Sequence, residues 1–267
     1  FASLISGYFF WGPRLRDAFL NANTLPAERL FVTGCPRFDF AAQRWSAAVP
    51  YPQQGYVLVN ANFPLVNPRF STSPEHERNT MVSVGWEGDY VDVLMREMKN
   101  VHRLYLDAVA ALAEKLPSIE FLVRPHPFEN AQIYHDRFAR LSNVRVDGSG
   151  SVLNVIRASR CVLHLNCGTA TEAVMMGKLP ISLEFLNTPH LLKHSTLPST
   201  ISWRATSLQH AADAIAQIDQ AARDFDFSSV HAQHIHPWFF ENDGAAGDRV
   251  VAALEQLVLP LPARAKH

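Results

Sequence analysis

The stretch CVLHLNCGTATEAVMMGKLPISL, residues 161–183, carries the pattern that decides the fold. Residues 161–165 are apolar apart from one histidine, which is typical of a strand buried on both faces. A loop follows, then a helix over 169–176 that Gly177 stops, and then a second apolar run at 180–183. This order predicts two parallel strands joined by a crossover helix.

The same alternation continues on both sides of this stretch. Further strands are predicted at 7–11, 30–33, 56–60, 120–123 and 144–146, and further helices at 14–23, 89–115, 152–159, 208–223 and 243–257. The proline-bearing stretch 61–88 is expected to be a long irregular loop. Alternating strands and helices predict an α/β fold with a Rossmann-type parallel sheet covered on both faces. Ligands bind at the carboxyl ends of the strands in such sheets, so polar residues there are the candidates for function.

The chain is expected to divide into an N-terminal and a C-terminal part. Residues 1–40 form only one αβ unit, so we interpret them as the last unit of an N-terminal Rossmann-like domain that is otherwise incomplete. Residues 41–54 suit a linker, 55–242 a C-terminal Rossmann-like domain, and 243–267 a helix and tail that cross back to the first domain. The opening at Phe1 lacks the charged region and cleavage site of a signal peptide, and we expect upstream residues.

The composition excludes several classes of protein. With 24 Lys and Arg against 25 Asp and Glu, the net charge is −1, which argues against a nucleic-acid groove because phosphate binding needs clustered cations. No apolar stretch approaches the length of about 18 residues that a membrane-spanning helix needs. The three cysteines form no C-x-x-C pair, which favours a reducing compartment. These cysteines are Cys35, Cys161 and Cys167.

The sequence Arg124-Pro125-His126-Pro127 directly follows the predicted strand 120–123. The prolines restrict the backbone, so Arg124 and His126 are held in a narrow range of positions at a strand end. A guanidinium and an imidazole there suit a phosphate group. The alternative is an ordinary turn with a surface arginine and a surface histidine.

A second candidate follows strand 161–165, where the chain reads Asn-Cys-Gly-Thr-Ala-Thr-Glu. Gly168 permits a ligand to approach the backbone closely. Thr169 is predicted to cap the next helix, with Glu172 at the spacing of a capping box, and the free amides there would form an anion site. Asn166 and Thr171 belong to the same motif, and Glu172 could instead accept hydrogen bonds from a ribose. Plain capping without a ligand explains the motif equally well.

Two carboxylates and a histidine cluster complete the candidates. Asp39, in the sequence GCPRFD at 34–39, is either a hinge clamp or a catalytic group facing a cleft. Asp89 is a candidate base or nucleophile from the polar stretch 60–92, but a solvated loop charge explains it better on its own, and the base could equally lie in an upstream N-terminal region. No metal site is expected, because no cysteine or carboxylate cluster completes a zinc set with the closely spaced His231, His234 and His236.

Six segments together resemble the bacterial surface carbohydrate (surface polysaccharide) biosynthesis family. They are FFWGPRLRDAF, LFVTGCPRFDF, YVLVNANF, FLVRPHP, LHLNCGTATEAVMMGKLPISLE and FFENDGAAGDRV, and they extend over nearly the whole chain. The family looks like GT-B glycosyltransferases, in which two Rossmann-like domains face a cleft, and its layout is similar to that of UDP-GlcNAc 2-epimerases. The His-Pro loop is similar to that of bacterial Kdo and sialic acid transferases, which use CMP-activated sugars.

The resemblance implies a cytoplasmic glycosyltransferase, acting at the inner face of the membrane if it associates with lipid. It would transfer a sugar, of the Kdo or sialic acid kind if the donor is CMP-linked, to a glycan or lipid-linked glycan. The donor phosphate would lie between His126, Arg124 and Thr169, with Glu172 on the ribose and no separate cofactor or metal. Peripheral membrane association and a homodimer are compatible with this interpretation.

Two other functions remain open. A UDP-GlcNAc 2-epimerase-like enzyme would keep the fold and change the chemistry, and a non-catalytic partner would bind nucleotide or glycan without turnover. Cys35 and Cys167 depart from the family pattern, which has Asn or Gly and Ser or Thr there. The loss of a hydroxyl at residue 167 removes one phosphate ligand, which leaves Thr169 and the backbone amides.

Overall fold

The computed structural model describes residues 4–42, 55–70 and 73–257, so most of the predicted linker 41–54 lies outside the described residues. The chain divides into two compact units, of which the first combines residues 1–50 with 227–267 and the second comprises residues 51–226. The second unit therefore ends at Asp226, whereas the sequence analysis extended it to residue 242. None of the helices in the described ranges has both the length and the hydropathy to cross a bilayer.

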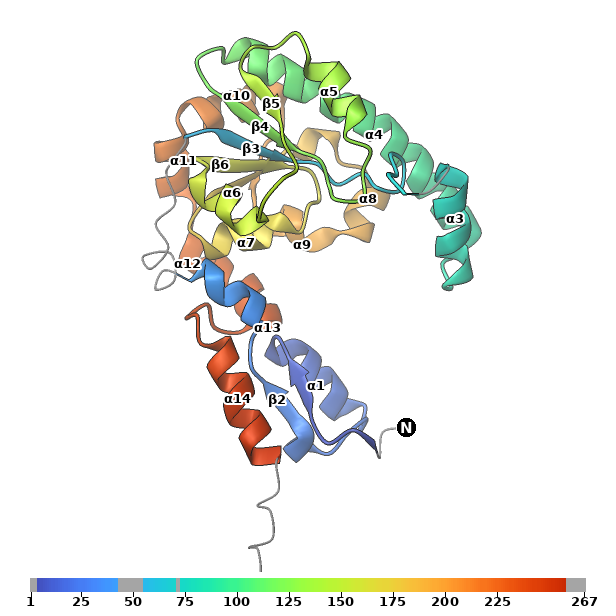
Figure 1. Ribbon diagram of the computed structural model, residues 1–267, viewed down its shortest axis with the longest axis vertical. Coiled ribbons are helices and arrows are strands. Elements are labelled where there is room, and N and C mark those ends of the chain that lie inside the picture. Colours follow the sequence, from blue (N-terminus) through green and yellow to red (C-terminus); the bar gives the residue numbers. More distant parts are fainter. Residues whose placement is uncertain (1–3, 43–54, 71–72, 258–267) are drawn as a thin grey trace, which may run out of the picture. The chain divides into compact units, whose positions relative to one another are not determined.

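A six-stranded, wholly parallel sheet forms the centre of the second unit (Figure 1). Its strand order is β5-β4-β3-β6-β7-β8, which is the doubly wound order 3-2-1-4-5-6 when counting starts at β3. This sheet confirms the predicted α/β class. The strands are β3 (Val57–Asn60), β4 (Phe121–Arg124), β5 (Val144–Val146), β6 (Cys161–His164), β7 (Leu179–Ser182) and β8 (Trp203–Arg204).

Helices cover both faces of this sheet, with α6 and α7 on one face and α4, α5 and α10 on the other (Figure 1). The longest, α4, buries an apolar stripe that includes Leu94, Val101 and Val109 and leaves its charged residues outside. The helices of this unit are α3 (Pro74–Ser83), α4 (Gly88–Lys115), α5 (Gln132–Phe138), α6 (Val152–Ala158), α7 (Thr169–Met175), α8 (Pro189–His194), α9 (Thr196–Thr200), α10 (Leu208–Ala216) and α11 (Ile218–Asp224), with a 3₁₀ turn at Glu184–Leu186.

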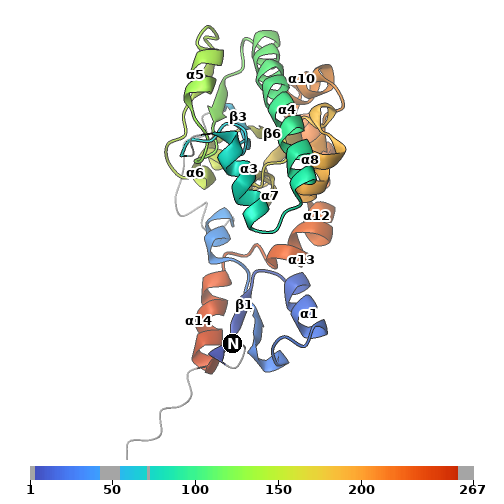
Figure 2. The same ribbon diagram turned by 90° about the vertical axis from the view of Figure 1, so that its right-hand side faces the viewer.

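The stretch 61–88 is not a continuous irregular loop, because α3 lies within it beside the start of α4 (Figure 2). Ser73 caps this helix by accepting the amide of His76 at 3.3 Å, and Pro74 occupies the first turn. Met81 is its one buried side chain among the described residues, so the helix has almost no apolar periodicity. The predicted helix 208–223 is likewise two helices, which meet at Gln217.

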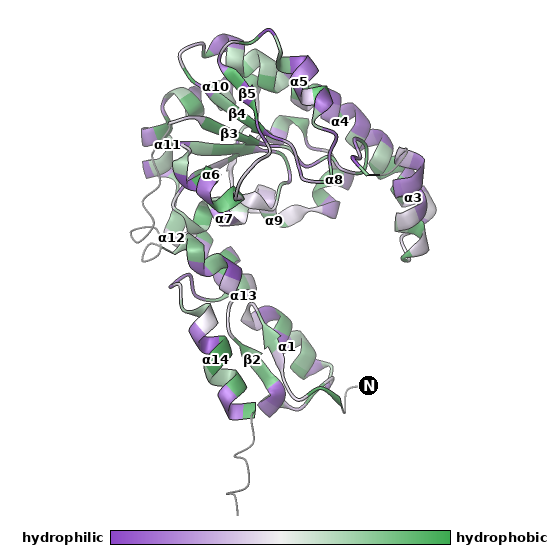
Figure 3. Cartoon of the chain, viewed as in Figure 1, coloured by the Kyte–Doolittle hydropathy of each residue, from purple (hydrophilic) through white to green (hydrophobic). Residues whose placement is uncertain are grey.

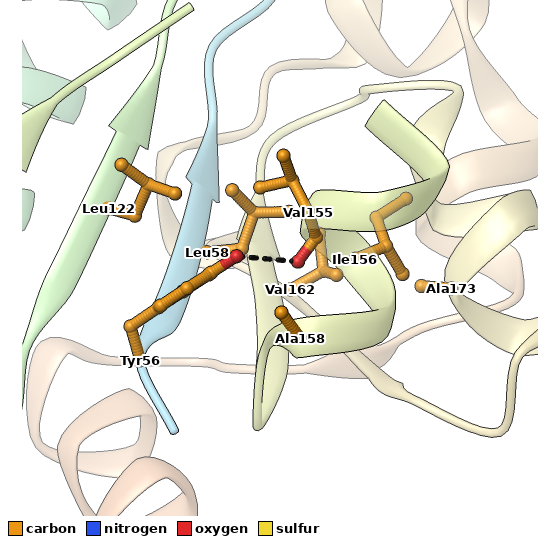
Figure 4. Close-up of a cluster of buried hydrophobic side chains, with 8 residues drawn as sticks. All are labelled: Tyr56, Leu58, Leu122, Val155, Ile156, Ala158, Val162 and Ala173. Atoms are coloured by element: carbon orange, nitrogen blue, oxygen red, sulfur yellow. Dashed lines mark hydrogen bonds between the residues drawn. The ribbon is translucent and has the colours of Figure 1, made fainter. Parts of the chain in front are cut away.

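The body of the sheet is apolar, and Figure 3 colours β3 and β4 as hydrophobic. One buried cluster joins β3, β4 and β6 to the helices α6 and α7, and Figure 4 shows its members. Leu58 is fully buried there, and Tyr56 donates its hydroxyl to the carbonyl of Val155 at 2.8 Å. The cluster consists of Tyr56, Leu58, Leu122, Val155, Ile156, Ala158, Val162 and Ala173.

The last residue of five of the six strands is polar, and the strand register aligns these residues in one row. Asn60 of β3 pairs with Arg124 on one side and with His164 on the other, and the row continues through Ser182 to Arg204. The preceding row consists of Val146, Val123, Val59, Leu163, Ile181 and Trp203. The sheet therefore changes from apolar to polar within one residue of its carboxyl edge.

The first unit is built on a β-α-β arrangement in which β1 runs parallel to β2. Phe10, Leu25 and Leu30 are buried between the strands and the helix and form its core. Its elements are β1 (Tyr8–Phe10), α1 (Pro13–Asn21), β2 (Leu30–Val32), α12 (Phe227–Val230), α13 (His236–Phe239) and α14 (Ala246–Leu257), with 3₁₀ turns at Ala27–Arg29 and Pro36–Ala41 and a π-helical turn at His231–Ile235.

The C-terminal segment belongs to this first unit. Arg249 of α14 donates its Nε to the carbonyl of Thr33 at 2.7 Å, directly after β2. Gly12 lies so close to Trp238 that a Cβ at residue 12 would come within 2.2 Å of the Trp238 backbone, so only glycine fits there. The helix predicted over 243–257 forms from Ala246 onward, and it packs against the turn Pro36–Ala41 and bonds to Thr33 after β2.

Candidate functional site

The sheet of the second unit reverses its strand order between β3 and β6, which is where ligands bind in doubly wound folds. Asn60 ends β3 at this switch point and is 3% exposed. Its Nδ2 donates to the hydroxyl of Thr169 at 2.8 Å, and its carbonyl accepts the hydroxyl of Tyr105 at 3.0 Å. Its Oδ1 is buried and has no hydrogen-bond partner among the described residues. A buried acceptor of this kind is expected to bind a water molecule or a ligand donor.

Asn166 shapes the loop that follows β6. Its φ of 51° lies in the left-handed region, which asparagine tolerates better than most residues. Its side-chain amide pairs with that of Asn187 in both directions, at 2.9 and 3.2 Å. Its carbonyl accepts Nδ2 of Asn62 at 2.9 Å and the hydroxyl of Ser195 at 3.4 Å. Asn166 therefore acts as the structural junction of this edge, holding the loops after β3, β6 and β7 together.

His164, at the end of β6, is fully buried, and burial lowers its pKa to about 3. Its Nδ1 accepts the amide of Cys167 at 3.4 Å, so the proton of the neutral ring lies on Nε2. Nε2 then donates to the hydroxyl of Ser202 at 2.9 Å, which donates to the carbonyl of Pro198 at 2.6 Å. The sequence analysis did not select this histidine, and its bonds give it a structural role beneath the site.

Helix α7 begins one residue earlier than a Thr169 cap would require. Its N-cap is Gly168, and no side chain caps it, so the predicted capping box is wrong. The hydroxyl of Thr169 instead donates to Sγ of Cys167 at 3.1 Å while accepting from Asn60. The hydroxyl of Thr169 therefore bonds to Asn60, at the end of β3, and does not accept a hydrogen bond from the amides of its own helix.

The start of α7 presents backbone amides to the carboxyl edge of the sheet. The amides of Ala170 and Thr171 bond to the carbonyls of Cys167 and Gly168, and that of Thr169 bonds to the thiol of Cys167, which leaves the amide of Gly168 without a partner in the described chain. A Cβ at Gly168 would meet no atom within 4 Å, so the space beside it is open. The side chains of Thr171 and Glu172 are each only 5% exposed. The accessible part of the motif is thus its backbone.

His126 follows β4, the strand on the other side of β3. Its Nδ1 accepts the amide of Phe128 at 3.2 Å, so Nε2 carries the proton and is the available donor. Partial burial lowers its pKa below the usual value, so the ring is neutral near pH 7. His126 thereby offers one oriented N–H group, as a phosphate-binding residue would.

Glu129 organises this loop and was not selected in the sequence analysis. It is 2% exposed and accepts the amide of His126 at 2.6 Å and that of Phe63 at 2.7 Å. The hydroxyl of Tyr134 donates to it at 2.9 Å and in turn accepts Nε2 of His102 at 3.2 Å. Burial raises the pKa of Glu129 to about 7, although these three hydrogen bonds oppose the shift. One carboxylate therefore holds the loops after β3 and β4 in register.

Arg124 is less available than the sequence suggested. Its guanidinium donates to the carbonyls of Ser149 and Gly150, at 2.5 and 2.8 Å, and so fixes the loop after β5. Burial lowers its pKa, while the nearby Asp147 opposes this shift. Arg124 contributes a positive charge behind the His126 loop, but two of its nitrogen atoms already have partners.

The two predicted catalytic carboxylates lie elsewhere in the chain. Asp39, in the first unit, accepts the amides of Ala246 at 2.9 Å and Gly247 at 2.8 Å, which favours the clamp interpretation because both oxygens hold the start of α14. Asp89 is exposed in the first turn of α4. It makes no hydrogen bond or ion pair with the His126 loop or with α7 in the described ranges.

A cavity of about 330 Å³ opens at the switch point. Asn62 and Asn166 line it from the strand ends, and Trp86, His194 and Ser195 line it from the side of α3 and α8. Its remaining walls are apolar and consist of Phe63, Pro64, Leu65, Met81, Met98, Leu165 and Leu191. Its size is at the lower end of the range of about 300–1,000 Å³ that small-molecule sites occupy.

Among the described residues no group of three or more His, Cys, Asp or Glu side chains is arranged to hold a metal ion. The cysteines are free and buried, and burial raises the pKa of Cys161 to about 12 and that of Cys167 above its usual value. A thiol with a raised pKa is a poor nucleophile at neutral pH. The cysteines are therefore weak candidates for a nucleophile at this edge.

No model of a known protein family matches the sequence, and no characterised protein sequence matches it either. Solved structures do match. They include the UDP-GlcNAc 2-epimerases of Neisseria meningitidis bound to UDP-GlcNAc (TM-score 0.52, 16% identity) and of Methanocaldococcus jannaschii in complex with UDP-GlcNAc and UDP (0.52, 11%). A variant of the wall teichoic acid polymerase TagF soaked with CDPG also matches (0.56, 12%).

The matches extend over 94% of this chain but only 58–61% of the length of those proteins. At such low sequence identity they establish the architecture alone. The protein therefore has a GT-B-like fold, in agreement with the expectation from the resemblance, and the chain spans about three fifths of the proteins that it matches.

Proposed function

We propose that this chain is the nucleotide-binding part of a GT-B glycosyltransferase of surface polysaccharide biosynthesis. One observation carries the proposal. His126 and the amides of Gly168 and Thr169 follow β4 and β6, the two strands that flank β3 at the switch point. We call these three groups the phosphate site. Nε2 of His126 and the amide of Gly168 are available donors, the amide of Thr169 would exchange its bond to the Cys167 thiol for one to phosphate, and helix amides are favourable for anions.

Catalysis at this site would consist of stabilising the departing phosphate. The oriented donors of His126, Gly168 and Thr169 gain most from the charge that develops as the glycosidic bond breaks. Arg124 adds a positive charge behind them, although its nitrogen atoms hold the loop after β5. The proposal assigns no metal to this step, because these groups supply the neutralising charge and dipoles.

The donor in this proposal is a pyrimidine-nucleotide sugar. The structures with the same fold contain UDP-GlcNAc, UDP or CDPG, and the His-Pro loop favours a CMP-linked sugar of the Kdo or sialic acid kind. Glu172 would hold the ribose after a local shift, because it is only 5% exposed. The acceptor is a glycan or lipid-linked glycan, and we place the reaction in the cytoplasm at the inner face of the membrane.

A UDP-GlcNAc 2-epimerase-like enzyme is the second candidate, because epimerases match the fold with scores close to those of the polymerase. The same phosphate site would then bind UDP, and carboxylates outside the described chain would carry acid and base chemistry. A binding protein without turnover would use the same site as well. All three functions would bind nucleotide at the same phosphate site, and they differ only in the product that is formed.

The test is to titrate CMP, CDP and UDP by calorimetry and to assay turnover in parallel. A glycosyltransferase extends a glycan primer from a CMP-sugar, an epimerase converts UDP-GlcNAc to its 2-epimer, and a binding protein does neither. His126→Ala should lower turnover by roughly 10–150-fold, because about 1.5–3 kcal/mol of bonding to the phosphate is lost. His135→Ala, on the exposed face of α5, is the matched control. Equal turnover in both variants would exclude the phosphate site.

A further inference from the structure

The cavity at the switch point, which we call the inner cavity, is neutral. No Asp, Glu, Lys or Arg occurs among the described residues that line it. An anionic ligand would leave water without a compensating charge there, which is unfavourable. The inner cavity is thus unsuited to the nucleotide phosphates assigned to the phosphate site, and it selects an uncharged group.

Three polar side chains in the inner cavity have unused hydrogen-bonding capacity. Oδ1 of Asn62 makes no bond with the described chain, because only its Nδ2 is used, toward Asn166. The ring nitrogens of His194 make none, and burial lowers the pKa of this ring, so it is neutral and can both donate and accept. The hydroxyl of Ser195 donates weakly to Asn166 and can still accept. An alkyl chain would leave these groups unsatisfied, whereas hydroxyl or acetamido groups would pair with them.

A second cavity, which we call the outer cavity, lies beside the inner one and shares Trp86 and His194 with it. The ring centroids of Trp86 and His194 lie 5.4 Å apart, and both rings line both cavities. Tyr90 stacks on Trp86 at 5.7 Å with an angle of 18° between the rings. Trp86 is 41% exposed, so one aromatic surface extends from the inner cavity to the outer one.

We infer that the two cavities bind consecutive residues of a glycan, with an uncharged acetamido or deoxy sugar in the inner cavity and the next residue beside Glu87 and Lys193 in the outer one. Sugar rings have apolar faces that pack on aromatic side chains, and Trp86 supplies such a surface, while Tyr90 stacks on it and has the amine of Lys193 over its own ring. Asn62, His194 and Ser195 would pair with the hydroxyl or amide groups, while Met81 and Met98 would contact the methyl group. This inference rests on the proposed function, in which the glycan is the acceptor, although the cavities themselves do not require nucleotide.

The experiment uses the whole chain and the methyl glycoside of N,N′-diacetylchitobiose as the uncharged probe. Binding is followed by tryptophan fluorescence and by saturation-transfer NMR, and CMP and UDP are titrated in the same samples. Trp86→Ala and Asn62→Ala should each weaken glycoside binding about ten-fold, while nucleotide affinity stays within about two-fold. Phe70→Ala, which removes an aromatic ring that is 72% exposed and outside both cavities, should change neither.

Two further probes test whether the inner cavity binds a lipid chain or an anionic sugar instead. Octyl alcohol that binds equally well in wild type and in Asn62→Ala would overturn the inference in favour of a lipid chain. A sialic acid methyl glycoside that binds as tightly as the neutral disaccharide would overturn the neutral selection. Absence of glycoside binding while nucleotides bind would refute the inference alone. Glycoside binding without nucleotide binding would support it and refute the proposed donor site. An unchanged thermal midpoint of each variant shows that it is folded.

Discussion

The body and the carboxyl edge of the second unit's sheet are made by the same strands, yet they bury opposite kinds of side chain. One residue before its end, β3 contributes the fully buried Val59, and at its end it contributes the equally enclosed Asn60. The body is held by apolar contact, which needs no particular partner, whereas each polar group of the edge needs a hydrogen bond in a defined direction. Stability is therefore concentrated in the body, and directed chemistry in the edge.

The largest expected effect is in the body. Leu58→Ala should lower the free energy of unfolding by about 2–5 kcal/mol, because Leu58 is fully buried in the cluster of Figure 4 and truncation leaves a cavity. Urea unfolding measures this loss, and nucleotide affinity of the folded fraction should stay unchanged. Val84→Ala, at a side chain that is 71% exposed, should cost less than about 0.5 kcal/mol. A change in nucleotide affinity for Leu58→Ala would remove the distinction between body and edge.

The next largest effect is expected at Glu129, whose carboxylate accepts three hydrogen bonds at the carboxyl edge. Glu129→Gln replaces one accepting oxygen by a donor that faces an amide, so a buried N–H loses its partner at a cost of about 1–3 kcal/mol. The loop of His126 should shift as well, so nucleotide affinity should fall together with stability. Calorimetry and urea unfolding check both quantities. Glu114→Gln, on the exposed face of α4, is the control, and equal behaviour of the two variants would contradict the role of Glu129.

The pH dependence sharpens the comparison further. The pKa of His164 in the folded protein is lowered from 6.5 to about 3, so the unfolded chain binds more protons between these values. Its contribution therefore makes the protein less stable as the pH falls through this range, by about 1.4 kcal/mol per pH unit. Chemical unfolding of wild type and His164→Asn at pH 6.5, 5.5 and 4.5 should show a flatter profile for the variant.

Other titratable groups also affect the wild-type profile, and they are common to both proteins. His102, whose pKa burial lowers to about 4, destabilises the folded protein in the same direction as the pH falls. Glu129 acts oppositely, because its raised pKa makes stability decline as the pH rises from 4.5 to about 7. The difference between wild type and His164→Asn isolates His164, and parallel profiles would refute its assigned pKa.

The smallest effect is expected at the contact that replaces the capping box. Thr169→Val removes the acceptor of Asn60 Nδ2 and also the weaker bond to Sγ of Cys167, and the loss should cost about 0.5–1.5 kcal/mol. Thr200→Val removes an exposed hydroxyl that bonds within its own helix and should cost less. Thermal unfolding compares the two variants. A larger loss for Thr200→Val would show that the contact between β3 and α7 does not stabilise the edge.

The strands of the body could be predicted because buried strands are continuous apolar runs, as at 120–123 and 161–165. Helix α3 was missed for the opposite reason, since Met81 is the one buried residue described in it and no apolar period results. Its start was nevertheless marked by Ser73 and Pro74, a cap followed by a proline in the first turn. A capping residue and a first-turn proline, without a periodic apolar pattern between the helix ends, thus indicate a helix that lies outside the core.

The edge was only partly predictable. The sequence located the loops of His126 and Gly168 correctly at strand ends, but local spacing favoured a cap at Thr169 over its contact with Asn60, 109 residues away. Glu129 was missed because a carboxylate in a loop is usually solvated, and its partners Phe63 and Tyr134 meet it only in the folded chain. The sequence signal that was available is a carboxylate three residues after His126, with Tyr134 five residues further along the chain.

The row of strand ends that runs through Asn60, His164 and Ser182 has a consequence for how this protein can change over evolutionary time. Because the row is one residue deep, substitutions in it alter what the sheet presents without touching Val59, Leu163 or Ile181 beneath it. A one-residue insertion within a strand, in contrast, would move a polar side chain into the apolar layer and reverse its facing. Relatives should therefore diverge in specificity by substitution along this row, while strand lengths stay constant.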